Sequence, residues 1–212
     1  MSTVYFFKNA DILNLDDIPS ELLPQDKLQK ADGAADIRYI TSILGEVILR
    51  TVIIEKMHID NSKIAFMRPK SGKPYLKYPY NFYFNISHSS SAVAVAVSDS
   101  EIGIDIEKYR KPDLRVAERY FTAGENDYIK NSSNPDFAFF EIWTAKEAFS
   151  KYNGSGISVS FFKTSVTDKN IKNKIFTVKK DDFFISVCSE NPASTVIKDI
   201  DISFLSKLQA LI

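Results

Sequence analysis

Hydrophobic residues recur at helical spacing in two long stretches of the chain. Within residues 36–55 the apolar positions lie three or four apart: Ile37, Ile40, Ile43, Leu44, Val47, Ile48 and Val52. Residues 137–152 are apolar or small around most of the helix circumference, and Asn153-Gly154 follows them. Residues on one helix face recur with this period, and glycine often ends such a run. The pattern predicts two long helices.

Shorter apolar runs have the length and composition of strands. We predict strands at residues 4–7, 82–86, 92–97, 102–107, 157–166, 174–179 and 183–188. Residues 98–101 are polar and predict a hairpin turn between two of these strands. The alanines in 92–97 predict the close approach of another element, most simply a packed helix. Residues 66–79 and 131–136 are predicted loops, and 114–120 and 125–129 are predicted short helices.

Each half of the chain places one long helix before a set of apolar strands. This order indicates an α+β fold with two similar lobes that meet near residue 100. The predicted division is 1–100 for an N-terminal lobe and 101–212 for a C-terminal lobe. No repeat of individual residues accompanies the similarity of order.

Composition limits the classes of function. Lys plus Arg and Asp plus Glu both number 27, so the chain lacks the basic surplus typical of a nucleic-acid binder. The single cysteine, Cys188, excludes an intramolecular disulfide and a multi-cysteine metal site, and its apolar surroundings predict a buried thiol. Residues 1–8 lack the features of a signal peptide, and no apolar run is long enough to span a membrane. We expect a cytoplasmic protein.

Two acidic residues share one face of a predicted strand. Asp105 and Glu107 are two positions apart, whereas Ile102, Ile104 and Ile106 point to the other face. Gly103 precedes them on their side and would let a ligand or a backbone approach closely. Taken alone, this pattern is more typical of the exposed face of a half-buried strand than of a metal site.

The second predicted helix carries an acid and a lysine one turn apart. Glu147 and Lys151 share a surface of a largely buried helix, where an acid needs a partner. That partner is either Lys151, in a simple ion pair, or a metal ion. Three acids on two rigid elements could hold a hard divalent cation, with the lysine near an anionic ligand. The joint pattern indicates magnesium-assisted chemistry on a phosphate ester.

Five separated motifs occur in order between residues 44 and 157. They are Gly72-Lys73-Pro74-Tyr75, the Phe84–Ser89 segment, Gly103-Ile104-Asp105-Ile106-Glu107-Lys108, the Phe121–Glu125 segment, and the run from Phe140 to Lys151 that contains Trp143-Thr144-Ala145-Lys146-Glu147. In this order the chain resembles the 4′-phosphopantetheinyl transferases of the long, surfactin-synthetase-activating type. The resemblance implies a pseudo-dimeric monomer in which each lobe packs a long helix on a small, mostly antiparallel sheet. Coenzyme A would bind in the cleft between the lobes.

The resemblance also implies an activity. Such enzymes transfer the 4′-phosphopantetheine arm of coenzyme A to a serine of an apo acyl or peptidyl carrier protein and release adenosine 3′,5′-bisphosphate. Asp105, Glu107 and Glu147 would coordinate Mg²⁺ or Mn²⁺. An acid of this cluster, Glu147 by the analogy, would accept the serine proton, and Lys151 would contact phosphate.

Further residues would bind the adenylate end of coenzyme A. By the resemblance His88, next to Ser87, meets the 3′-phosphate, with Lys73 close by. Lys27 and Lys30 lie where the family places 3′-phosphate lysines, although a solvated helix face explains them equally well. Residues 121–134 would form the carrier-protein surface.

Two other functions stay open at this stage. One is a magnesium-dependent phosphodiesterase or nucleotidyl transferase built on the same acids. The other is a non-catalytic module that binds coenzyme A or a carrier protein, although the presence of all three acids disfavours it. The sequence does not say whether the acceptor belongs to fatty acid, polyketide or non-ribosomal peptide synthesis.

Overall fold

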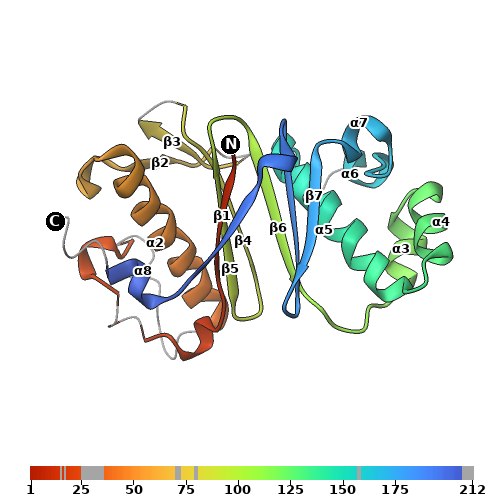
Figure 1. Ribbon diagram of the computed structural model, residues 1–212, viewed down its shortest axis with the longest axis horizontal. Helices are drawn as coiled ribbons and strands as arrows, with labels where there is room; N and C mark the ends of the chain where they lie inside the picture. Colours follow the sequence, from red (N-terminus) through yellow and green to blue (C-terminus); the bar gives the residue numbers. More distant parts are fainter. Residues whose placement is uncertain are drawn as a thin grey trace.

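Two sheets lie back to back between two long helices, in a mixed α+β structure (Figure 1). The computed structural model describes residues 1–14, 16, 18–24, 36–69, 73–78, 81–156 and 159–206. Helix α2 (Ile37–Met57) covers the outer face of one sheet, and helix α5 (Pro135–Asn153) covers the outer face of the other. The two long helices predicted from the sequence pattern are therefore confirmed.

The first sheet has the strand order β4-β5-β1-β9, and the second has the order β6-β8-β7. The strands of the first are β1 (Thr3–Phe7), β4 (Tyr83–Ser89), β5 (Ala92–Ser98) and β9 (Val196–Ile200). Those of the second are β6 (Ile102–Lys108), β7 (Ile175–Lys180) and β8 (Phe183–Ser189). All pairs are antiparallel except β1 with β9.

The alternation along β5 separates two cores. Its valines Val93, Val95 and Val97 pack in the core that contains α2. Its alanines Ala92, Ala94 and Ala96 pack against the isoleucines of β6. The predicted close approach to the alanines is therefore confirmed, but the approaching element is a strand of the second sheet and not a helix.

The prediction of a hairpin turn at residues 98–101 is wrong. Strand β5 already pairs with β4 on one side and β1 on the other, so it has no free edge for β6. The chain instead crosses at these residues to the second sheet, where β6 pairs with β8. The polar turn residues of 98–101 are compatible with either path.

Side chains join the two sheets where the edge strands β4 and β6 face each other. Asn85 Oδ1 accepts a hydrogen bond from the Ile104 amide at 2.9 Å. Two serine hydroxyl oxygens of β4 likewise accept from amides of β6, Ser87 from Ile106 at 3.3 Å and Ser89 from Lys108 at 3.1 Å. We call these three contacts the seam.

The end of the described chain returns to the first sheet. Strand β9 pairs with β1, and in helix α8 (Ile202–Ser206) the ring of Phe204 lies 5.4 Å from that of Tyr5. The division into 1–100 and 101–212 stays a prediction, and this returning segment does not follow it.

Two regions differ from their predicted structure. Within residues 66–79, predicted as a loop, strands β2 (Ala65–Met67) and β3 (Tyr75–Tyr78) pair as a small separate sheet. Within residues 157–166, predicted as a strand, the chain forms helix α6 (Val159–Lys163). Both differences concern short runs, whose local pattern does not separate strand from helix or loop.

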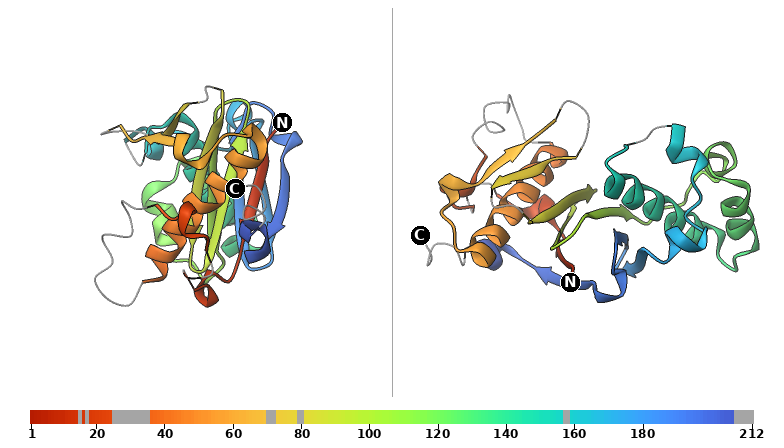
Figure 2. Two further views of the ribbon diagram at one scale, coloured as in Figure 1. Left: turned by 90° about the vertical axis from the view of Figure 1, so that its left-hand side faces the viewer. Right: turned by 90° about the horizontal axis from the view of Figure 1, so that it is seen from above.

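The remaining elements are short. They are α3 (Arg115–Tyr120), α4 (Ala123–Asn131), α7 (Lys169–Lys172), and the 3₁₀ turns η1 (Ala10–Ile12), η3 (Ser20–Leu22), η4 (Asn61–Lys63) and η5 (Pro192–Ser194). Helices α3, α4, α6 and α7 lie beyond α5, at the end of the molecule opposite α2 (Figure 2). Among the described residues no helix has the length and apolar character needed to cross a membrane.

Candidate functional site

A glycine lets helix α5 rest directly on strand β6. A Cβ atom on Gly103 would lie 2.1 Å from the carbonyl oxygen of Ala148 and 2.4 Å from the Tyr152 amide nitrogen, both on α5. Any other residue would therefore push the helix away from the strand. The predicted close approach at this glycine is confirmed, and the approaching group is the backbone of α5.

This contact brings Asp105 of β6 to Lys151 of α5. Lys151 Nζ donates to Asp105 Oδ1 at 2.7 Å and to the hydroxyl oxygen of Ser87 at 3.0 Å. The Ser87 hydroxyl in turn donates to Asp105 Oδ1 at 2.9 Å. Three elements, β4, β6 and α5, thus converge on one carboxylate oxygen.

The other oxygen of this carboxylate is not satisfied. Asp105 is 5% exposed, and its Oδ2 is buried without a hydrogen-bond partner in the described structure. Burial raises the pKa of Asp105, Lys151 lowers it, and the negative charge of Glu107 raises it further. A buried anionic oxygen without a partner is costly unless a cation or donor meets it.

Glu147 lies one helical turn before Lys151 and is partly buried. Burial, followed by repulsion from Asp105, raises its pKa from 4.5 to about 6, and Lys151 partly opposes the rise. No ion pair joins Glu147 to Lys151 within the described residues, because Lys151 pairs with Asp105. The simple ion pair considered for Glu147 and Lys151 is therefore wrong.

Glu107 completes the acidic face of β6. Its Oε2 accepts a hydrogen bond from the Ser89 hydroxyl at 2.9 Å and lies 3.5 Å from a guanidinium nitrogen of Arg110. Each seam serine thus orients one acid of β6. In the part of the chain that the structure describes, no three His, Cys, Asp or Glu side chains are grouped as a ready metal site, and Lys151 is the cation bound to Asp105.

Two of the other predicted binding residues, Lys73 and His88, lie within the described structure. Lys73 Nζ donates to the carbonyl oxygen of Ile102 at 2.5 Å and to Glu101 Oε2 at 2.8 Å. His88 is exposed, and strand alternation turns it away from Ser87. Lys27 and Lys30 lie outside the described residues.

His88 lines a pocket of ≈ 220 Å³ between α2, β4 and the small sheet. Glu46 and Arg68 also line it, together with the rings of Phe66 and Phe84. Sequence reasoning missed Glu46 and Arg68, because neither lies in a motif. The ion pair between them, 3.3 Å long, depends on contacts that only the fold creates.

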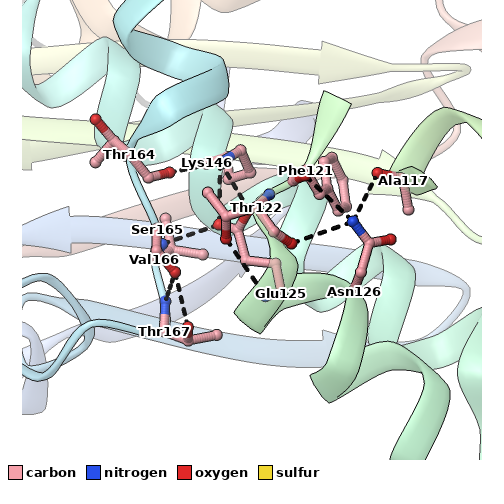
Figure 3. Close-up of polar contacts among 10 residues, drawn as sticks. All are labelled: Ala117, Phe121, Thr122, Glu125, Asn126, Lys146, Thr164, Ser165, Val166 and Thr167. Atoms are coloured by element: carbon pink, nitrogen blue, oxygen red, sulfur yellow. Dashed lines mark hydrogen bonds and ion pairs between the residues drawn. The ribbon is translucent and has the colours of Figure 1, made fainter. Parts of the chain in front are cut away.

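A second acid–lysine pair joins α5 to α4 (Figure 3). Lys146 Nζ donates to both carboxylate oxygens of Glu125 at 3.0 Å and to the Thr164 carbonyl at 2.6 Å. Glu125 Oε1 also accepts from the Val166 amide at 2.9 Å, and Oε2 from the Thr122 amide at 2.9 Å. The two side chains are 1% and 0% exposed.

The pair links three segments in the half of the molecule that contains α5. Thr122 and Glu125 form a capping box at the start of α4, so the same carboxylate both begins α4 and binds α5. The segment after α6 is held through Thr164 and Val166. This cluster was not predicted, since Lys and Glu within a helix also fit a solvated face.

Two family models match adjacent parts of the chain. A model described as "4'-phosphopantetheinyl transferase, N-terminal" matches residues 24–100, and one described as "4'-phosphopantetheinyl transferase superfamily" matches residues 101–202. Together they cover both long helices and both sheets apart from β1.

Similar curated proteins include three bacterial 4′-phosphopantetheinyl transferases. Gsp of Aneurinibacillus migulanus is 35% identical over 142 residues, which cover 62% of this chain and 58% of that protein. Psf-1 of Bacillus pumilus is 38% identical over 65% of this chain and 62% of its own length. Sfp of Bacillus subtilis strain 168 is 36% identical over 59% of this chain and 57% of its own length. The chain thus spans about 60% of the length of these relatives.

Proposed function

Because the chain belongs to the 4′-phosphopantetheinyl transferase superfamily, we propose that it transfers the phosphopantetheine arm of coenzyme A to a serine of an apo acyl or peptidyl carrier protein. The observation that carries this proposal is the convergence of Ser87, Asp105 and Lys151 beside Glu147. The second product is adenosine 3′,5′-bisphosphate.

The two halves of the molecule are proposed to act as similar lobes of one monomer, with coenzyme A between them. Each half has one long helix on a small sheet, which supports the idea. The seam supports it further, because its serines come from the first sheet and the acids they orient come from the second.

The acids fit a hard divalent cation such as Mg²⁺ or Mn²⁺. Asp105 Oδ2 is a buried oxygen without a partner in the described structure, and burial, with a smaller contribution from repulsion among the acids, raises the pKa of Asp105 and of Glu147. Mg²⁺ in proteins is bound mainly by oxygen ligands, and the carboxylates of these acids supply such oxygens. We propose these three residues as its ligands; when bound, it would neutralise the charge on the pyrophosphate and on the leaving group.

Glu147 is proposed to accept the proton of the incoming serine. A pKa of about 6 leaves this carboxylate largely ionised at neutral pH and still basic enough to take a proton. The serine oxygen bonds to the phosphorus that carries the pantetheine arm. The bond from that phosphorus to the bridging oxygen breaks, and the bridging oxygen leaves with adenosine 3′,5′-bisphosphate.

Lys151 is proposed to stabilise the negative charge of the reacting phosphates. Its side chain is 29% exposed, so the ammonium can face a ligand while its stem packs on α5. Its hydrogen bonds to Ser87 and Asp105 hold it at the seam. A positioned cation of this kind acts mainly on charge that develops in the transition state.

The carrier protein is proposed to dock near α4. The exposed face of this helix presents Tyr128, which is 44% exposed and donates to Glu141 Oε2 on α5 at 3.0 Å. The opposite face holds Glu125 and Ile129 and is buried. Docking here would place the carrier beside the helix that bears Glu147 and Lys151.

The test is mass spectrometry of several apo carrier proteins incubated with coenzyme A, Mg²⁺ and this protein. We expect a mass increase of one phosphopantetheine arm, with stoichiometric release of adenosine 3′,5′-bisphosphate. Release of the nucleotide without modification of any carrier would indicate a phosphodiesterase instead. Binding of coenzyme A without release would indicate a non-catalytic module.

A further inference from the structure

We propose that Arg68 binds the 3′-phosphate of coenzyme A and sets the preference of this protein for coenzyme A over 3′-dephospho-coenzyme A. The inference rests on the proposed function, which names coenzyme A as the substrate. Arg68 directly follows β2 and belongs to none of the sequence motifs. It is selected by its place in the pocket that also contains His88.

The pocket combines apolar surfaces with two basic side chains. Phe66, Phe84 and Pro74 contribute apolar lining, and Arg68 and His88 are the basic residues among those that line it. Flat apolar surfaces suit a purine ring, while a guanidinium suits phosphate because its planar fork donates two parallel hydrogen bonds. The residue types therefore match an adenosine that carries a phosphate group.

Two arginines, Arg50 and Arg68, pair with the single carboxylate of Glu46, so one positive charge exceeds what this carboxylate neutralises. Glu46 is 5% exposed, and Arg50 donates to its Oε1 from Nε at 3.2 Å and from a terminal nitrogen at 3.1 Å. Arg50 is itself largely buried and also donates to Asn61 Oδ1 at 3.0 Å. Arg50 thus already neutralises the buried carboxylate.

Arg68 is held less firmly than Arg50. Its single described ion pair joins a terminal nitrogen to Glu46 Oε2 at 3.3 Å, and its side chain is 57% exposed. A long exposed side chain with one weak contact can turn toward a phosphate at small cost. The buried Glu46 would keep its pair with Arg50 after such a movement.

Lys73, expected beside His88 from the sequence, is directed elsewhere. Its ammonium binds the carbonyl oxygen of Ile102 and the Glu101 carboxylate, and its side chain is only 15% exposed. Lys73 therefore joins the segment before β3 to the start of β6. Arg68 is the residue that supplies a fixed positive charge to the described lining of the His88 pocket.

The experiment compares two ligands in matched variants. Isothermal titration calorimetry measures the Kd of coenzyme A and of 3′-dephospho-coenzyme A for the wild type, Arg68→Ala, Arg68→Lys and the control Arg115→Ala. Arg115 is likewise an exposed arginine paired with an acid, Asp113, but it lies in the other half of the molecule. Melting temperatures establish that each variant is folded.

We expect Arg68→Ala to weaken coenzyme A about tenfold, the size of one charge-assisted hydrogen bond, and to leave the Kd of the dephospho form unchanged. Arg68→Lys should restore part of the loss, and Arg115→Ala should affect neither ligand. Equal weakening of both ligands, or no weakening of coenzyme A, would overturn the proposal.

The outcome is independent of the transfer reaction. Binding requires no carrier protein, so a wild type that modifies no carrier would contradict the proposed function while the comparison of ligands could still be made. Conversely, an active wild type whose Arg68→Ala variant treats both ligands alike would contradict only the role of Arg68. If Arg68→Ala does not fold, Arg68→Gln keeps most of the stem and gives the same comparison.

Discussion

Helix α5 carries two lysines that each bind a buried carboxylate, and the two pairs differ in how completely their atoms are satisfied. Around Lys146 and Glu125 both carboxylate oxygens accept an ammonium and a backbone amide, and the ammonium also meets a carbonyl. Around Lys151 and Asp105 one carboxylate oxygen accepts two donors and the other accepts none.

The difference separates a structural pair from the pair that we propose to be functional. A buried ion pair whose donors and acceptors are all hydrogen-bonded has no free atom with which to bind a ligand. A buried carboxylate with one empty oxygen, beside a second acid whose pKa is raised, retains capacity to bind a cation. Lys146 and Lys151 are five positions apart along α5, so the two pairs lie on different faces of the same helix.

The largest expected effect is on stability, at the satisfied pair. Replacing one partner, in Lys146→Met, leaves Glu125 buried without its cation and should lower the free energy of unfolding by about 3–5 kcal/mol. Urea denaturation measures the change. The double variant Lys146→Met/Glu125→Gln removes both charges and should recover part of the loss.

The transfer rate per folded molecule should change little in Lys146→Met. A stability loss below about 1 kcal/mol, typical of an exposed pair, would show that the pair is not the structural one. A loss of activity with unchanged stability would reverse the comparison.

The second effect is on catalysis, at the unsatisfied pair. Asp105→Asn keeps the shape of the side chain but removes the charge, and should reduce the transfer rate about 10²–10³-fold. Stability should not fall in parallel, because an amide is less costly to bury than an unsatisfied anion. Initial rates and melting temperature together give the result.

Asp113→Asn is the matched control for this variant, since Asp113 is an exposed aspartate paired with Arg115. If the two variants reduce the rate equally, Asp105 has no special role. The pair of Asp105 and Lys151 would then have no demonstrated part in transfer, and the two lysine pairs would not differ in function.

The smallest effect is a pH dependence of stability at Glu147. Its pKa is raised from 4.5 to about 6, so the folded state binds its proton more tightly than the unfolded state does. The resulting stabilisation is complete below about pH 4.5 and is lost as the pH rises through 6. Denaturation of the metal-free protein between pH 4.5 and 7 should show this loss.

The Glu147→Gln variant cannot lose a proton and should not show that component. The difference between wild type and variant is the quantity to measure, because other groups titrate in both. If the stability of the wild type and of the variant changed in parallel over this range, the pKa of Glu147 would not be raised in the folded protein.

Periodicity predicted the elements that carry the acids and the lysine. Asp105 and Glu107 fall on β6, Glu147 and Lys151 on α5, and Gly103 admits the helix to the strand. These features depend on spacing within one segment, which a sequence displays directly. The motifs themselves also led to the family.

What the sequence did not predict depends on contacts between distant segments. Nothing local shows that β6 pairs with β8 instead of β5, or that Glu125 reaches Lys146 across 21 positions. The role proposed for Arg68 likewise follows from its place beside Glu46 and His88. Short runs such as those of β2, β3 and α6 were misassigned because tertiary packing outweighs their weak local preference.

The seam between β4 and β6 also affects how the protein behaves in a crowded solution. Both strands lie at the edge of their sheets, and an edge strand with free amides can pair with a strand of another molecule and start aggregation. Here Asn85, Ser87 and Ser89 occupy the amides of Ile104, Ile106 and Lys108 with side-chain oxygens. Side-chain acceptors satisfy these amides without offering a new edge, so the two serines that orient the acids, together with Asn85, also keep β6 from pairing with a second chain.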